Sequence, residues 1–221
     1  MLIINCNDEA LSLLPWTFFY QKVEWIWTSW TQFINTNLFA QSNHQIETKI
    51  AVNRTIASWD AVSLFWSYWN VTPPSQWASL WNYLHLTTLN NKWYIWRNNS
   101  EVNWWSFSWT IWNVYTVVFN DSSSNVVVNW STVWSSSWCV NYPSTTLAIS
   151  VRWTTQQSRI NWWYYNFYYF KIYDKNTWKY VREMIPCYRK SDNVIWMFDT
   201  VNKVFYTNNG TWSFTKWPDV N

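Results

Sequence analysis

The 221-residue chain is predicted to fold as an all-β sandwich or barrel. Short segments rich in β-branched and aromatic residues alternate with turns of Ser, Asn, Thr and Pro, such as 70–75 and 121–125. No ten-residue stretch has the apolar period of a helix, although 10–14 could form one short helical turn. The length suits one large β-sandwich or two small domains, and we find no internal repeat.

Period-two alternation marks the clearest strand, 45–52, where Ile46, Thr48 and Ile50 share one face and Glu47 and Lys49 share the other. The remaining predicted strands are 61–65, 83–89, 114–119, 126–129, 147–151, 166–173, 180–185, 194–198 and 203–206. Pro186 follows one of them and is predicted to mark a strand end or a sheet edge. Residues 1–21 are predicted to be a tail or the end of an upstream segment, and 22–221 to form the domain.

The chain has 25 tryptophans and one glycine, the reverse of the usual proportion of these two residues in proteins. Average usage would give about 15 glycines. Many tryptophans also lie in turn contexts: Asn129-Trp130-Ser131 would be a strong hairpin signal if residue 130 were glycine. Some bacterial lineages and their phages decode UGA as glycine, and translating such a gene with UGA as Trp would produce this pattern. The alternative is a truly Trp-rich binding protein.

The decoding hypothesis makes a structural prediction, because glycine adopts positive φ without strain and tryptophan does not. Several of the tryptophans should lie in turns or at strand ends, with positive φ or large exposure. The prediction applies to Trp104, Trp130, Trp162, Trp178 and Trp212.

Composition argues against several function classes. The net charge is +3 without a basic stripe, which disfavours nucleic-acid binding. No apolar run reaches 18 residues, so we expect no membrane span. The three cysteines lack metal-site spacing, and His44 and His85 have no ligand-spaced partner, so loop or strand-surface roles are expected for both histidines.

Candidate binding and catalytic groups are sparse. No two acids are spaced to share one strand face, as the carboxylate pair of a glycan-cleaving enzyme would require, so the chain is predicted not to be an enzyme. The tyrosines that could stack on a sugar are Tyr164, Tyr165 and Tyr168. Calcium could be held by Asp192, Asn193 and Asp199, although turn chemistry explains these residues equally well and is preferred.

Three segments carry a family resemblance. With glycine at Trp196 and Trp212, residues 185–199 and 204–214 resemble the closing segment of laminin-G-like, concanavalin A-like domains of bacterial surface and phage structural proteins. Residues 28–36 (T-S-W-T-Q-F-I-N-T) are similar to the opening strand of that family, with Asn35 replacing the usual Asp. Residues 167–174 (F-Y-Y-F-K-I-Y-D) are similar to a late strand of the same family.

The resemblance, over roughly 22–221, implies a concanavalin A-like jelly roll of two antiparallel sheets whose ends meet near Phe33 and Phe214. It implies a non-catalytic recognition or adhesion module that binds a glycan or another cell-surface component. No cofactor is expected, although members of the family sometimes carry one structural calcium. The expected setting is extracellular, on a cell surface or in a virion, within a longer chain or fibre. The alternatives are a glycoside hydrolase of the same superfamily and a structural spacer without a ligand.

Overall fold

The computed structural model describes residues 20–28, 34–39, 41–53, 62–66, 85–89, 92–97, 100–105, 109–120, 125–134, 146–151, 165–208, 214–216 and 218–220. Every element in this part of the chain is a β-strand. In order they are β1 (Tyr20–Lys22), β2 (Ile26–Thr28), β3 (Ile34–Phe39), β4 (His44–Val52), β5 (Val62–Trp66), β6 (His85–Leu89), β7 (Lys92–Arg97), β8 (Ser100–Trp105), β9 (Val114–Asn120), β10 (Asn125–Val128), β11 (Ser131–Trp134), β12 (Thr146–Val151), β13 (Tyr165–Asp174), β14 (Lys179–Arg189), β15 (Ile195–Asp199), β16 (Val204–Tyr206) and β17 (Thr215–Lys216).

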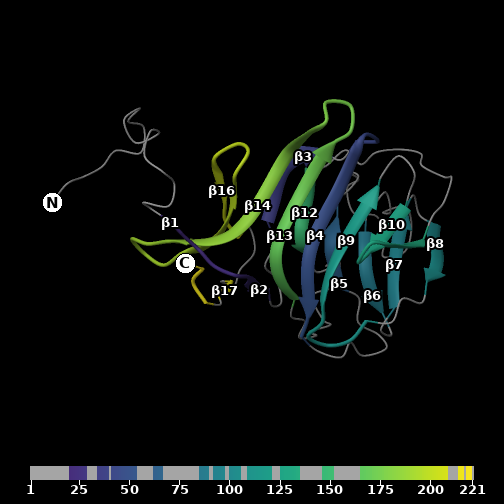
Figure 1. Cartoon of the computed structure of the whole chain (residues 1–221), viewed down its shortest axis with the longest axis horizontal. Coiled ribbons are helices and arrows are strands. Elements are labelled where there is room, and N and C mark those ends of the chain that lie inside the picture. Colours follow the sequence, from purple (N-terminus) through teal and green to yellow (C-terminus); the bar gives the residue numbers. More distant parts are fainter. Residues whose placement is uncertain are drawn as a thin grey trace, which may run out of the picture.

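The strands form two antiparallel sheets. The larger has the order β11-β10-β9-β4-β13-β14-β15-β16, with β1, β2 and β17 paired beside it, and the smaller has the order β3-β12-β5-β6-β7-β8. The chain passes repeatedly from one sheet to the other, which is the connectivity of a jelly roll. Figure 1 shows the larger sheet across the front with β5, β6 and β7 behind it. The predicted jelly-roll sandwich of two antiparallel sheets is therefore confirmed.

Aromatic rings from both sheets fill the space between them. The Phe65 ring on β5 lies 6.2 Å from the Phe119 ring on β9 and 6.0 Å from the Phe170 ring on β13, with edge-to-face geometry in both pairs. All three side chains are buried. Burying one such side chain contributes about 1.5–3 kcal/mol, so these contacts are a main source of attachment between the sheets.

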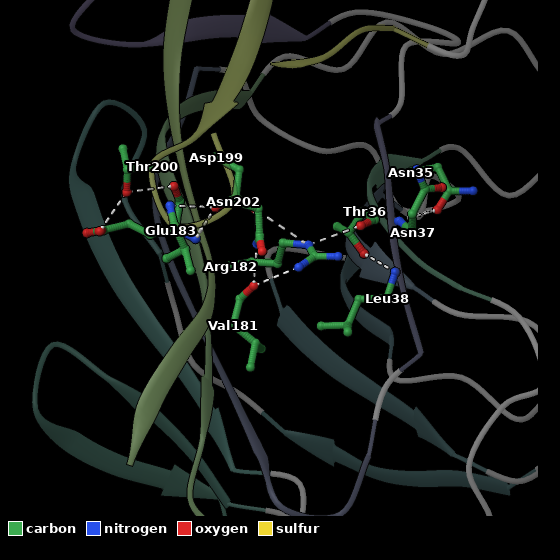
Figure 2. Close-up of polar contacts among 11 residues, drawn as sticks. Asn35, Thr36, Asn37, Leu38, Val181, Arg182, Glu183, Asp199, Thr200 and Asn202 are labelled. Carbon is green, nitrogen blue, oxygen red and sulfur yellow. Dashed lines mark hydrogen bonds and ion pairs between the residues drawn. The ribbon is translucent and has the colours of Figure 1, made fainter. Parts of the chain in front are cut away.

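A buried ion pair also connects the sheets at one end. Arg182 on β14 donates from Nε to the carbonyl oxygen of Thr36 on β3, at 3.2 Å. The same nitrogen lies 3.6 Å from Oδ2 of the fully buried Asp199 on β15. Figure 2 shows Arg182 extending between these strands, so one guanidinium joins the two sheets.

The two ends of the described fold meet in the larger sheet. β2 pairs with β17, and Val23 forms a bridge with Asp219. Phe214, just before β17, is buried in the core. Phe33 lies outside the described residues, as do residues 1–19, so the domain boundary at 21/22 stays a prediction.

Pro186 lies inside β14 rather than at a strand end, which corrects the sequence-based expectation. On one side β14 pairs continuously with β15, where Pro186 faces Met197. On the other side the partner changes: β13 pairs as far as Met184, and β1 pairs from Cys187 onward, with its last residue, Lys22, opposite Cys187. Pro186 thus occupies a gap in the ladder, where its missing N–H leaves no strand partner unsatisfied.

The tryptophan prediction is confirmed at two of its five positions. Trp130 lies in the β10–β11 turn with φ of 71°, and Trp178 lies in the β13–β14 turn with φ of 57°. Trp104 is the penultimate residue of β8. Trp162 and Trp212 lie outside the described residues. Within the described ranges, no helix is long and apolar enough to cross a membrane.

Candidate functional site

The outer face of the larger sheet carries a group of aromatic and charged side chains at its centre. Alternate residues of β4, β13 and β14 (Thr48, Phe170 and Met184) are fully buried toward the smaller sheet, so their strand neighbours project outward. We call these outward residues the outer-face cluster. Its members are Glu47, Tyr169, Lys171, Tyr173, Glu183 and Tyr180, the last because a register shift between β13 and β14 places it opposite Tyr173.

Strand register aligns three of these residues in one row. Lys171 on β13 is directly opposite Glu47 on β4 and Glu183 on β14. Neighbouring strands lie about 4.8 Å apart, so two carboxylates flank one ammonium group within about 10 Å. These acids are 136 positions apart in number (183 minus 47), and the sequence alone gave no sign that they share a face.

Short contacts hold the row together. Lys171 Nζ lies 3.0 Å from Glu183 Oε1 and sits over the rings of Tyr169 and Tyr180, 4.9 and 5.3 Å from their centroids. The Tyr169 hydroxyl donates to Glu47 Oε1 at 2.6 Å. Each charged group therefore has a polar or aromatic neighbour on an adjacent strand.

These contacts set the protonation states of the cluster. Burial, followed by the hydrogen bond to Glu47, raises the pKa of Tyr169, so its hydroxyl remains a donor. Burial acts to lower the pKa of Lys171, but the hydrogen bond and charge of Glu183 outweigh it and raise that pKa. Burial acts to raise the pKa of Glu183, but Lys171 and Thr200 outweigh it and lower that pKa. At neutral pH the pair is therefore ionised.

The β15–β16 turn positions Glu183. Its backbone N–H donates to Asp199 Oδ1 at 3.1 Å, and its carbonyl accepts the Thr200 N–H at 2.7 Å. The Thr200 hydroxyl donates to Glu183 Oε2 at 2.8 Å, as drawn in Figure 2. The backbone and the carboxylate are both fixed, so Glu183 presents its oxygens in a defined orientation.

Two further tyrosines extend the cluster toward the β13–β14 turn. The Tyr173 and Tyr180 rings are 5.4 Å apart and nearly perpendicular. The Trp178 indole also packs edge-to-face against Tyr173, with ring centroids 6.5 Å apart. Tyr180 is 41% exposed, so this end of the cluster offers aromatic surface to solvent.

The sequence-predicted stacking tyrosines are only partly described, and sugar stacking at them stays a prediction. Tyr168 is half-buried at a β-bulge in β13, with Lys49 Nζ 5.4 Å from its ring centroid. Tyr165 begins β13, opposite Thr28 of β2. Tyr164 lies outside the described residues.

The three calcium candidates do not converge. Asp192 and Asn193 lie in the exposed turn before β15, and Asp199 ends that strand. Asp192 pairs with Arg189, and the buried Asp199 accepts from Glu183, Val201 and Asn202. No cluster of three metal-ligating side chains occurs among the residues that the structure describes. Calcium binding stays an untested alternative to the turn chemistry predicted for these residues.

His44 differs from the sequence-based expectation, whereas the side chain of His85 is outside what the structure describes. His44 begins β4 and is buried, and its Nδ1 has no hydrogen-bond partner. Burial lowers its pKa, against the opposing effect of Asp174. His44 is therefore a neutral interior residue rather than a surface one.

Comparisons with known proteins give structural likenesses alone. Protein-family models and curated proteins give no match. An alginate lyase of polysaccharide lyase family 7 is 10% identical, with a TM-score of 0.40, over 66% of this chain and 62% of the lyase. The carbohydrate recognition domain of Emp47p is 11% identical, with a TM-score of 0.41, over 71% of this chain and 95% of that domain.

A third similar structure is botulinum neurotoxin type C, described as depending on two ganglioside molecules for cell entry. It is 14% identical, with a TM-score of 0.39, over 65% of this chain and 37% of the toxin chain. The matched regions span less than two thirds of the lyase and of the toxin chain. Likenesses at these scores leave the function of this chain open.

The prediction that the chain is not an enzyme is corrected. An alginate lyase is among the similar structures, which contradicts that prediction. The exclusion rested on acids spaced along single strands, whereas the sheet brings Glu47 and Glu183 together across three strands. Spacing along a single strand cannot detect carboxylates that neighbouring strands bring to the same face.

Proposed function

We propose that the protein binds a glycan on the outer-face cluster of its larger sheet. One observation carries the proposal: on an outward face, Tyr169 and Tyr180 contact Lys171 of the Lys171–Glu183 ion pair, and Tyr173 packs against Tyr180. Carbohydrates present both apolar C–H faces and rows of hydroxyl groups. A surface that recognises them needs aromatic rings beside fixed donors and acceptors.

The cluster supplies both kinds of group. The exposed ring of Tyr180 and its neighbour Tyr173 offer edges and faces for a sugar ring. Lys171 donates to hydroxyl oxygens, and the ionised Glu183 accepts from hydroxyl groups. Because Thr200 and Lys171 already hold Glu183, little side-chain entropy is lost when a ligand binds.

A glycan array tests the proposal. The unaltered chain should bind a defined subset of glycans, and Tyr180→Ala should lower that signal at least tenfold. Val204→Ala is the matched control, because Val204 is an exposed residue on β16, outside the cluster. Absence of binding across a broad array would contradict the proposal and favour the structural spacer.

Glycan hydrolysis at the same place is a second candidate, favoured by the Glu47–Lys171–Glu183 row. Hydrolases that invert configuration separate their two carboxyl groups by about 6.5–9.5 Å, close to the spacing of alternate strands. The lowered pKa of Glu183 suits the base of such a pair rather than the acid.

Product analysis separates binding from cleavage. Oligosaccharides bound on the array are incubated with the chain, and new reducing ends are measured. Hydrolysis predicts their release by the unaltered chain and its loss in Glu183→Gln, with Asp192→Asn, a change in an exposed turn, as the control. Binding without release would contradict the hydrolase candidate.

We further propose that the protein works at a cell surface or in a virion, where glycans are accessible, as the resemblance to laminin-G-like domains of such proteins implies. Immunogold labelling of cells and virions from the source would test this setting. Label confined to the cytoplasm would contradict it.

A further inference from the structure

Three tryptophans adopt a backbone conformation that suits glycine. Among the described residues, the non-glycine positions with positive φ include Trp112 at 69°, Trp130 at 71° and Trp178 at 57°. The left-handed region costs an L-residue about 1–2 kcal/mol, and a bulky side chain is rare there. The other such residues are Asn37, Asn129, Asn193 and Lys203.

The turn at Trp130 shows why glycine belongs there. Val128 pairs with Ser131, so Asn129 and Trp130 form a two-residue hairpin loop. Both have positive φ, at 46° and 71°, as a type I′ turn requires. Asn-Gly is the preferred dipeptide of that turn, because glycine has no Cβ to clash.

The indole side chains at the same three positions are largely exposed to solvent. Trp112, Trp130 and Trp178 are 65%, 91% and 77% exposed. Two other tryptophans, Trp109 and Trp196, have indole N–H groups that are buried without a hydrogen-bond partner. A buried tryptophan N–H usually finds a partner, so the polar group of neither of these two indoles is satisfied.

We infer that positions 112, 130 and 178 are glycine in the protein made by its own cells, through UGA codons decoded as glycine, and that glycine at 178 completes the glycan site. The second part rests on the proposed function. In the present sequence the Trp178 indole packs edge-on against Tyr173. Glycine would uncover that side of Tyr173 and give a ligand both tyrosines, 173 and 180, as one surface.

The first test determines directly which amino acid the natural protein has at these three positions. The codons for these three positions should be UGA, and peptides of the protein purified from its source organism should have the masses of glycine at all three. UGG codons, or peptides with the mass of tryptophan, would overturn the inference.

The second test uses variants of the present chain. Trp130→Gly should raise the urea midpoint, whereas Phe39→Gly, an exposed change in β3, should lower it. A midpoint that falls in Trp130→Gly would overturn the assignment at that position.

The third test isolates the glycan site. Trp178→Gly should tighten the binding of a glycan identified on the array at least threefold, and Trp130→Gly should leave it unchanged. Equal affinity in the two variants would overturn the role of position 178 alone. Failure of every variant to bind any glycan would contradict the proposed function, while the codon and mass results would still decide the glycine assignment.

Discussion

The buried carboxylate of Asp199 accepts the backbone N–H of Glu183 at 3.1 Å, so an interior residue of β15 fixes a solvent-facing residue of β14. The other oxygen of Asp199 accepts from Asn202 at 2.7 Å and faces Arg182 at 3.6 Å. Both carboxylate oxygens of Asp199, one of the calcium candidates, thus have partners inside the protein, and the residue has no exposed surface. Asp199 therefore contacts both Arg182, which joins the two sheets, and Glu183, which belongs to the outer-face cluster.

Replacing Asp199 should be strongly destabilising. Asp199→Ala leaves the mostly buried Arg182 without its counter-charge, and breaking such a pair costs about 3–5 kcal/mol. Urea unfolding measures the loss. Asp192→Ala removes an exposed pair with Arg189 and should cost about 1 kcal/mol or less. Equal losses in the two variants would contradict the account of the buried pair.

The aromatic contacts between the sheets give a second prediction. Phe65→Ala should lower the free energy of unfolding by about 3–5 kcal/mol, because it opens a cavity between Phe119 and Phe170. Phe39→Ala is the control at an exposed position and should change it by about 0.5 kcal/mol or less. Chemical denaturation measures the free energy of unfolding of both variants. A small loss in Phe65→Ala would contradict the role of this residue in the core.

The lowered pKa of Glu183 predicts an acid dependence. A carboxylate whose folded pKa is below its unfolded value of 4.5 stabilises the fold above that pH, and its contribution disappears as pH falls through the folded pKa. The stability difference between the unaltered chain and Glu183→Gln should therefore be largest above pH 4.5 and shrink in acid.

Lys171→Met provides the matched test of the cause, since it removes the strongest partner of Glu183. In the Lys171→Met variant, the change in stability caused by Glu183→Gln should depend less on pH. A difference that grows as pH falls would contradict the assigned direction of the pKa shift.

Burial raises the pKa of Cys187 to about 12, which predicts slow alkylation. Against an unshifted value of 9.0, iodoacetamide at pH 8 should modify the folded chain at Cys187 about 1,000-fold more slowly than the unfolded chain. Peptide mapping separates Cys187 from Cys6 and Cys139. Equal rates with and without urea would show that this thiol is accessible.

Much of the larger sheet could be predicted from the sequence. Alternation at 45–52 and 166–173 corresponds to β4 and β13, each within about two residues of its observed bounds, because one face of each strand is buried. β7 and β8 were missed. Each contains two tryptophans, and reading those residues as glycine removed the β-propensity that marks a strand.

The outer-face cluster could not be predicted in the same way. Its row depends on which strands become neighbours and in what register, and β4 and β13 are separated by more than 100 residues along the chain. The aromatic run near Tyr168 did indicate β13 as a candidate surface. Which residues of that run meet Lys171 depends on the bulge between Phe167 and Tyr169.

Fluorine NMR tests the central claim, glycan binding by the outer-face cluster, most directly. The chain is labelled with 3-fluorotyrosine, its resonances are assigned with Tyr173→Phe, Tyr180→Phe and Tyr206→Phe, and a glycan identified on the array is added. The account predicts saturable shifts for Tyr173 and Tyr180, and no shift for Tyr206, which is buried at the end of β16. Shifts confined to tyrosines outside the cluster would contradict it.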